Sequence, residues 1–186
     1  MKSKLFVVAG PSGVGKGTII KELINENKNL KYSVSSTTRT PRPGEINGIN
    51  YNFLSQEEFK KAIDNEEFLE WAVYNGNYYG TSKSAVNGAL KNNKSIILEI
   101  EIQGAIQIME KCPDAVFIFI LPPSYEELEK RLRGRNTEDE QTILNRLKIT
   151  QIELAVGEKF KYRVVNDSVE RAVAQIRTII EKEWEC

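Results

Sequence analysis

The stretch Gly10-Pro11-Ser12-Gly13-Val14-Gly15-Lys16-Gly17-Thr18 decides the fold of this chain. It follows an apolar run, Leu5 to Ala9, and precedes isoleucine and leucine residues at helical spacing from Ile19 to Ile24. A strand, a glycine-rich turn and a helix in this order predict a phosphate-binding loop. Backbone N–H groups and the helix N-terminus attract phosphate oxygens there, and Lys16 supplies a charge for the outer phosphates. We therefore expect residues 10–18 to bind a purine nucleoside triphosphate; a glycine-rich turn without a ligand is the alternative.

One position departs from the usual pattern of such loops. Gly17 stands where Ser or Thr would give a hydroxyl to Mg²⁺, and Thr18 follows one residue later. We expect Mg²⁺ as a cofactor that the triphosphate carries. The sequence does not assign the protein ligands of this Mg²⁺; Thr18 and Glu99 are candidates that would bind it through water.

The composition of the chain limits the classes of function. In 186 residues, 26 Lys and Arg balance 26 Asp and Glu, so no net charge points to nucleic acid or to a membrane surface. Cys112 and Cys186 are too few for a disulfide framework, and no apolar run reaches the length of a membrane span. We expect a cytoplasmic protein with no nucleic-acid, membrane or obligate protein partner. The absence of histidine removes the commonest general base.

Apolar runs alternate with helical patterns along the chain. The runs lie at 5–9, 95–102, 115–121 and 162–165, and this alternation predicts an α/β fold of three layers, with a parallel core sheet flanked by helices. Helix starts are expected at Ser55, Ser124, Thr137 and Asp167, because each has Glu three residues later. A last helix with Ile176 and Ile180 on its apolar face is expected to close the core.

Two regions differ from this core and are interpreted as insertions into one domain that spans 1–186. Residues 34–83 are rich in hydroxyl, Asn, Gly and Tyr residues and predict a small mixed α/β unit; residues 124–157 are strongly charged and predict a helical lid. The core then comprises 1–33, 84–123 and 158–186. Both insertions should lie at the carboxyl edge of the sheet, where ligands bind in open α/β folds.

A second phosphate group has a candidate site within 34–83. The segment from Ser33 to Gly44 is dense in hydroxyl groups and carries Arg39 and Arg42, whose guanidinium forks suit a phosphate. Tyr51 and Tyr79 add phenolic groups, and we expect the run from Gly76 to Gly80 to form a turn. A solvated loop with surface arginines is the alternative.

Three carboxylates have candidate roles. Glu70 lies among large apolar residues, and a buried carboxylate there would select guanine, which offers two adjacent donors where adenine has an acceptor. Hydroxyl groups of Ser35 and Thr81 would bind the guanine carbonyl oxygen. A salt-bridged surface glutamate is the alternative for Glu70. Glu99 and Glu101 are expected on one face of the strand over 95–102, toward Mg²⁺ or substrate, unless that strand is a solvent-facing edge.

Seven segments together resemble the guanylate kinases. In family order they are GPSGVGKGT, SVSSTTRTPRPGEINGINYNF, EFLEWAVYNGNYYGTS, ILEIEIQGA, FIFILPPS, LRGRNTEDE and Val165-Asn166-Asp167, and they span nearly the whole chain. The resemblance implies a bacterial-type GMP kinase of the phosphate-loop nucleoside monophosphate kinases. It implies that Ser35, Glu70, Thr81 and Glu101 bind guanine, and that Arg39, Arg42, Tyr51 and Tyr79 grip the GMP phosphate. It implies catalytic cations at Lys16, Arg39, Arg135 and Arg146, ATP contacts at Arg131 and Asn166, and Glu99 near the metal.

The implied reaction transfers a phosphoryl group from ATP to GMP and gives ADP and GDP. A phosphate oxygen of GMP is the nucleophile and is largely ionised at neutral pH, so no general base is required. dGMP is expected as a further substrate. Two alternatives remain: a phosphopeptide-binding module of the same fold without catalysis, and a kinase of another monophosphate.

Overall fold

Five parallel strands form the central sheet, in the order β2-β7-β1-β8-β9. The computed structural model describes residues 3–134 and 140–185. The strands of this sheet are β1 (Leu5–Ala9), β2 (Leu30–Tyr32), β7 (Ser95–Glu99), β8 (Val116–Leu121) and β9 (Tyr162–Val165). β1 lies in the middle, with its side chains buried on both faces, and it pairs in parallel with β7 and β8. The parallel sheet of the predicted α/β fold is confirmed.

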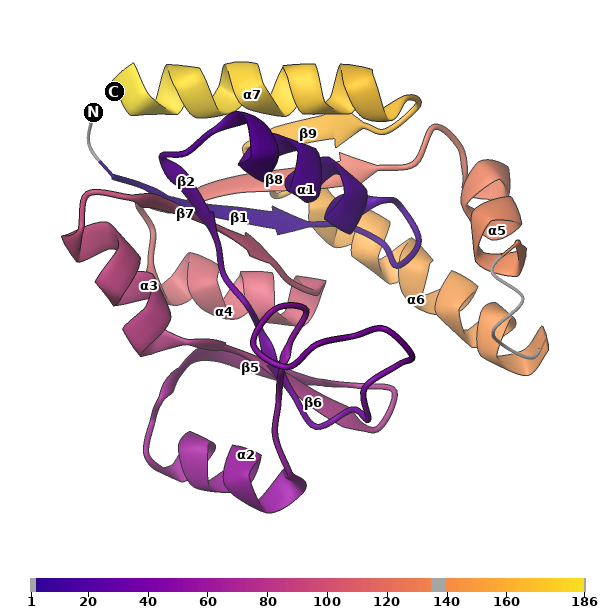
Figure 1. The fold of residues 1–186 in the computed structure, drawn as a ribbon. Helices are drawn as coiled ribbons and strands as arrows, with labels where there is room; N and C mark the ends of the chain where they lie inside the picture. The colour runs from indigo at the N-terminus through magenta and orange to yellow at the C-terminus, as the bar shows by residue number, and fades with distance from the viewer. Residues whose placement is uncertain (1–2, 135–139, 186) are drawn as a thin grey trace.

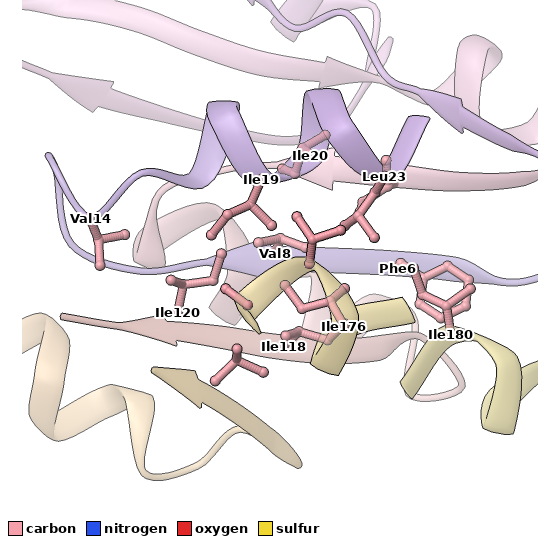
Figure 2. Packing of buried hydrophobic residues seen from close by; sticks show 14 of the residues in the cluster. Phe6, Val8, Val14, Ile19, Ile20, Leu23, Ile118, Ile120, Ile176 and Ile180 are labelled. Carbon is pink, nitrogen blue, oxygen red and sulfur yellow. The ribbon is translucent and has the colours of Figure 1, made fainter. Parts of the chain in front are cut away.

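Helices cover both faces of this sheet, as Figure 1 shows. They are α1 (Lys16–Glu26), α3 (Lys83–Lys91), α4 (Ile102–Lys111), α5 (Tyr125–Arg133), α6 (Glu140–Gly157) and α7 (Val169–Glu185). On one face, Val8, Ile118 and Ile120 pack against α1 and α7 (Figure 2). On the other face, Val7 and Leu98 pack against α3 and α4. The expected three layers are therefore present.

A second, smaller sheet lies beside the carboxyl edge of the first. Its strands are β3 (Ser36–Thr37), β4 (Asn52–Phe53), β5 (Phe68–Tyr74) and β6 (Asn77–Ser82), in the order β4-β3-β6-β5, and α2 (Gln56–Asp64) precedes β5. β5 and β6 form an antiparallel hairpin, and β5 is an edge strand. The predicted capping box at Ser55 begins α2, where Ser55 and Glu58 exchange both hydrogen bonds.

The strand expected over 95–102 is shorter than predicted. β7 ends at Glu99, and Glu101 is the residue that precedes α4, with its carbonyl oxygen accepting the N–H of Ala105. The argument that Glu99 and Glu101 share a strand face is therefore wrong. A short apolar run cannot reveal where a strand gives way to a helix, because buried isoleucines such as Ile100 and Ile102 suit a strand and a helix equally well. The short strand β2 was not predicted.

The run from Gly76 to Gly80 is also not a turn. The turn is formed by Asn75 and Gly76, both at positive φ, and the rest of the run belongs to β6. Gly80 pairs with Ser36 and Trp71 in the sheet. A Cβ at Gly80 would lie 2.9 Å from the Phe68 ring, so this glycine serves close packing.

The start of the last helix lies one residue later than predicted. The Ser168 hydroxyl, not Asp167, accepts the N–H of Arg171 three residues along. The cap expected at Thr137 lies outside the described residues.

The end of α7 is fastened to the central sheet by hydrogen bonds. The carboxylate of Glu183 accepts hydrogen bonds from Lys4 at 3.1 Å and from Lys161 and the Tyr162 hydroxyl at 2.6 Å each. These donors, Lys161 foremost, lower the pKa of Glu183 to about 2. Trp184 donates its indole N–H to the Ser95 hydroxyl at 2.7 Å.

Candidate functional site

The glycine-rich loop joins β1 to α1 and curls around the side chain of Lys16. The ammonium group is buried and donates to the carbonyl oxygens of Gly10 at 2.6 Å and Pro11 at 3.3 Å. Gly10 has φ of 155°, and a Cβ there would lie 2.5 Å from the Ile120 carbonyl oxygen, so only glycine fits this close approach. The lysine is thus held inside the loop, at the N-terminus of α1.

Asn166, which is distant from the loop in sequence, supports the loop on the side away from the cavity. The Asn166 amide is buried and donates to the Val14 carbonyl oxygen at 2.7 Å. Arg131 lies on the other side of Asn166, with its guanidinium 3.4 Å from the Asn166 carbonyl oxygen. Val14 itself belongs to the hydrophobic core. These three predicted ATP-binding residues therefore form the support of the loop and do not line the cavity described next.

A cavity of about 340 Å³ opens between the loop, the second sheet and α6. Most of the predicted site residues line it. They are Ser12, Gly13, Gly15, Lys16, Gly17, Thr18, Ser35, Arg39, Arg42, Tyr51, Glu70, Tyr79, Glu99, Glu101 and Arg146. Gly10 and Pro11 contact Lys16 from outside the lining, and Thr81 reaches it through Glu70. Arg135 lies outside the described residues.

One wall of the cavity carries the arginine and tyrosine cluster. Arg39 binds both carboxylate oxygens of Glu45, at 2.8 and 3.0 Å, and lies over the Tyr51 ring with 5.4 Å to the centroid. Glu45 also accepts the backbone N–H of Arg42 at 2.7 Å. Burial raises the pKa of Tyr51 to about 12, which keeps its hydroxyl protonated as a donor. Glu45 was not predicted, although it lies within the same sequence segment.

Glu70 of β5 also lines the cavity and is 4 % exposed. Thr81 donates its hydroxyl to the Glu70 carboxylate at 2.6 Å. Burial raises the pKa of Glu70 to about 7, opposed by the Thr81 hydrogen bond and the charge of Lys111. Among the described residues, the Oε2 atom of Glu101 is also buried without a hydrogen-bond partner. Two carboxylates thus face the same space with oxygen atoms ready to accept donors.

A second acidic group lies beside Lys16. Burial raises the pKa of Glu99, and the Lys16 charge opposes this rise. A Cβ at Gly17 would lie 3.4 and 3.5 Å from the two Glu99 carboxylate oxygens. Glu153 of α6 was not predicted; it is 3 % exposed, and burial raises its pKa to about 7. Helical periodicity would place Glu153 on the inner face of α6, but its type suggests the surface.

Tyr74 lines the cavity and was not predicted. It comes from the end of β5, and the Arg146 guanidinium lies over its ring at 5.9 Å from the centroid. Arg146 also donates to the Ser12 hydroxyl of the phosphate loop at 3.3 Å. The second sheet, the loop and α6 therefore meet at these three side chains. No signal in the sequence distinguishes Tyr74 from a packing residue.

Comparisons with known proteins address the family. The family model of guanylate kinase matches residues 2–183. The chain is 53% identical to the guanylate kinase of Caldanaerobacter subterraneus subsp. tengcongensis over 95% of this chain and 85% of the relative. It is 50% identical to that of Prochlorococcus marinus over 95% and 96%. The chain belongs to the guanylate kinase family.

A solved guanylate kinase structure agrees with this assignment. The crystal structure from Anaplasma phagocytophilum superposes with a TM-score of 0.81 at 32% identity, covering 97% of this chain and 86% of that one. Membership in the guanylate kinase family confirms the predicted enzyme class, an ATP-dependent GMP kinase, and does not favour the non-catalytic module. Among the helices that the structure describes, none has the length and apolar character needed to cross a bilayer.

The oxygen donors of the site fit Mg²⁺ carried by a nucleotide. The Thr18 hydroxyl and the Glu99 carboxylate line the cavity beside Lys16. Within residues 3–134 and 140–185, no three His, Cys, Asp or Glu side chains gather into a site for a metal. Mg²⁺ in phosphoryl-transfer enzymes usually takes one or two carboxylates, several waters and substrate phosphates. The residues present suit that mode of binding, in which the protein supplies few ligands.

Proposed function

We propose that the cavity holds both nucleotides of the reaction, with ATP phosphates on the loop of residues 10–18 and GMP between Arg39 and Glu70. The observation that carries this proposal is that Lys16 and Glu70, a phosphate ligand and a base-selecting carboxylate, line one cavity. A cavity lined by both cations and buried acceptors suits a nucleotide that has a phosphate and a base with donors.

The acceptor nucleotide is recognised at two places. The guanine N1–H and amino group would donate to Glu70, assisted by Glu101. Ser35 would donate to the guanine carbonyl oxygen, while Thr81 holds the Glu70 carboxylate. The GMP phosphate would bind Arg39, Arg42, Tyr51 and Tyr79. Adenine presents an acceptor at N1 and has no amino group at C2, so in the same pose it would leave the Glu70 carboxylate without both donors, which costs free energy in a buried site. The 2′-hydroxyl of the ribose has no role in this scheme, so dGMP should also be accepted.

Phosphoryl transfer then depends on position and charge. A GMP phosphate oxygen attacks the terminal phosphorus of ATP, and the bond to the ADP oxygen breaks. Lys16 and Arg146 neutralise charge on the transferred group, and Arg135 joins them by its place in the sequence pattern. Arg39 fixes the attacking phosphate in line. Thr18 and Glu99 would hold Mg²⁺ through water, and the metal would neutralise charge on the ATP phosphates.

The domain division remains part of this proposal. The core would comprise 1–33, 84–123 and 158–186, the GMP-binding insertion 34–83 and the lid 124–157. The contacts of Arg146 with Ser12 and the Tyr74 ring support a lid that meets both nucleotide sites. Closure of the lid over the substrates would exclude water and limit ATP hydrolysis. Because ATP and GMP are cytoplasmic metabolites, we place the enzyme in the cytoplasm.

A substrate panel tests the proposal directly. Steady-state rates with GMP, dGMP, AMP and UMP, at saturating ATP and Mg²⁺, should show turnover of GMP and dGMP and little turnover of AMP or UMP. Turnover of AMP equal to that of GMP would contradict the role of Glu70. Small-angle scattering with both nucleotides would test closure, and an unchanged shape would argue against a moving lid.

A further inference from the structure

The edge strand β5 is completed by side chains of a helix. On the side of β5 away from β6, the Trp71 N–H donates to Gln107 Oε1 at 3.3 Å, and Gln107 Nε2 donates to the Trp71 carbonyl oxygen at 2.7 Å. Lys111 donates to the Leu69 carbonyl oxygen at 2.8 Å. The Gln107 carboxamide thus pairs with Trp71 as a neighbouring strand would. Figure 1 shows α4 between the central sheet and β5.

The two anchored residues, Leu69 and Trp71, lie directly before and after Glu70. The Glu70 side chain turns toward α4, where a Cβ on Gly104 would overlap its carboxylate. Thr81 of β6 holds the same carboxylate from the other side. Both the backbone and the side chain of Glu70 are therefore fixed against the first three turns of α4.

We propose that Gln107 and Lys111 are positioning residues that aim the Glu70 carboxylate at the guanine base. We call this pair the α4 clamp. The proposal rests on the guanine-selecting role given to Glu70 above. Because Glu101 lies at the start of the same helix and lines the same cavity, the clamp also fixes the spacing between two carboxylates that face the base. The clamp thereby fixes Glu70, which belongs to the second sheet, in position relative to α4 and the central sheet.

Lys111 has an electrostatic effect in addition to its hydrogen bond. The charged groups that act on Glu70 are Lys111 and Glu101, from the two ends of α4, and they act in opposite directions. Only an ionised carboxylate accepts both guanine donors. The ammonium of Lys111 therefore helps to keep Glu70 in the form that binds GMP.

The first test removes the carboxamide. Inosine monophosphate lacks the 2-amino group of GMP, so the ratio of kcat/KM for GMP to that for inosine monophosphate measures how well Glu70 meets that group. We expect Gln107→Leu to lower this ratio about tenfold through a raised KM for GMP, with KM for ATP unchanged within about twofold. Gln175→Leu, the same change at an exposed site on α7, is the matched control and should alter neither value. A lower melting temperature with an unchanged ratio would overturn the proposal.

The second test removes the charge at the exposed end of the clamp, where loss of folding is not expected. Lys111→Met should shift the pH dependence of GMP binding toward higher pH, and Lys111→Arg should restore it. Lys182→Met, at an exposed position on α7, is the control. The same pH dependence in Lys111→Met and in the unaltered protein would contradict the electrostatic part.

Glu70→Gln separates this inference from the proposed function. If Glu70→Gln leaves the ratio of GMP to inosine monophosphate unchanged, the role of Glu70 itself fails, and the clamp fails with it. If Glu70→Gln lowers the ratio but Gln107→Leu and Lys111→Met do not change it, the clamp alone fails. If all three lower it, and Lys111→Met has no further effect in the Glu70→Gln protein, the clamp acts through Glu70.

Discussion

The two halves of the cavity are built in opposite ways. The half proposed for the ATP phosphates comes from nine consecutive residues, and its buried charge, Lys16, is satisfied by carbonyl oxygens of the loop itself. The half proposed for GMP is assembled from β5, β6 and the residues that precede β3 and α4, and its buried carboxylate, Glu70, has a raised pKa. The first half is complete before its ligand arrives. The second is held in a less favourable electrostatic state that bound guanine would relieve.

The largest effect is expected in the first half. Lys16→Met should lower kcat on the order of 10²-fold or more, because a charge beside the transferred phosphoryl group is lost. Lys21→Met, at an exposed lysine on the same helix, is the control. Circular dichroism should show a folded protein in both. Near-normal turnover of Lys16→Met would remove Lys16 from the reaction.

Glu70→Gln tests the second half. The amide offers one acceptor where guanine needs two, so kcat/KM for GMP should fall about 10²-fold while KM for ATP changes little. Glu67→Gln, at an exposed position directly before β5, is the matched control. Unchanged discrimination between GMP and AMP would exclude Glu70 from base recognition.

The affinity for GMP should depend on pH through Glu70. Glu70 has a pKa of about 7 without ligand, and guanine donors lower it, so GMP affinity should be full above pH 7 and fall up to about tenfold per unit below it. Calorimetric titrations of wild type and Glu70→Gln with GMP, between pH 5.5 and about 8, separate the titration of Glu70 from that of the GMP phosphate, whose second pKa is about 6.

The folding stability of the ligand-free protein should depend on pH in the opposite direction. A carboxyl whose pKa is raised from 4.5 in the folded state stabilises it below pH 4.5, and this contribution is lost as pH rises through 7.

Glu45→Gln probes the phosphate end of the second half. Glu45 orients Arg39 and holds the backbone of Arg42, so its loss should raise KM for GMP about threefold, the size typical of a partly exposed ion pair. A lower KM would instead indicate that Glu45 competes with the phosphate for Arg39.

The smallest effect is expected at Gly17. A Cβ at this position makes ordinary contact with Glu99, so Gly17→Ser should fold and change kcat/KM for ATP less than about twofold. A Mg²⁺ titration of the rate checks this. A large gain in rate or Mg²⁺ affinity would show that Gly17 is a defect in the metal site.

The same contrast explains how far the sequence predicts the molecule. The phosphate loop is local, so spacing alone specified its strand, turn and helix, and apolar runs specified the parallel sheet. In the second half, residue types within 34–83 indicated the arginines, the tyrosines and Glu70, and the family resemblance agreed with them, but Tyr74, Gln107 and Glu153 were missed. Their contacts join segments far apart in the chain, and neither a tyrosine in a strand nor a glutamine on a helix carries a local signal. The prediction that the strand continues beyond Glu99 was wrong for a different reason, since buried isoleucines suit a strand and a helix equally well.

The bond between Asn166 and Val14 has a consequence for synthesis on the ribosome. The phosphate loop leaves the exit tunnel well before Asn166, its support, which lies more than 150 positions later in the chain. The face of β1 that α7 covers must also wait for Ile176 and Ile180. A nascent chain should therefore carry the nucleotide motif long before it can bind ATP tightly, and the exposed strand would be a target for chaperones until α7 has been synthesised.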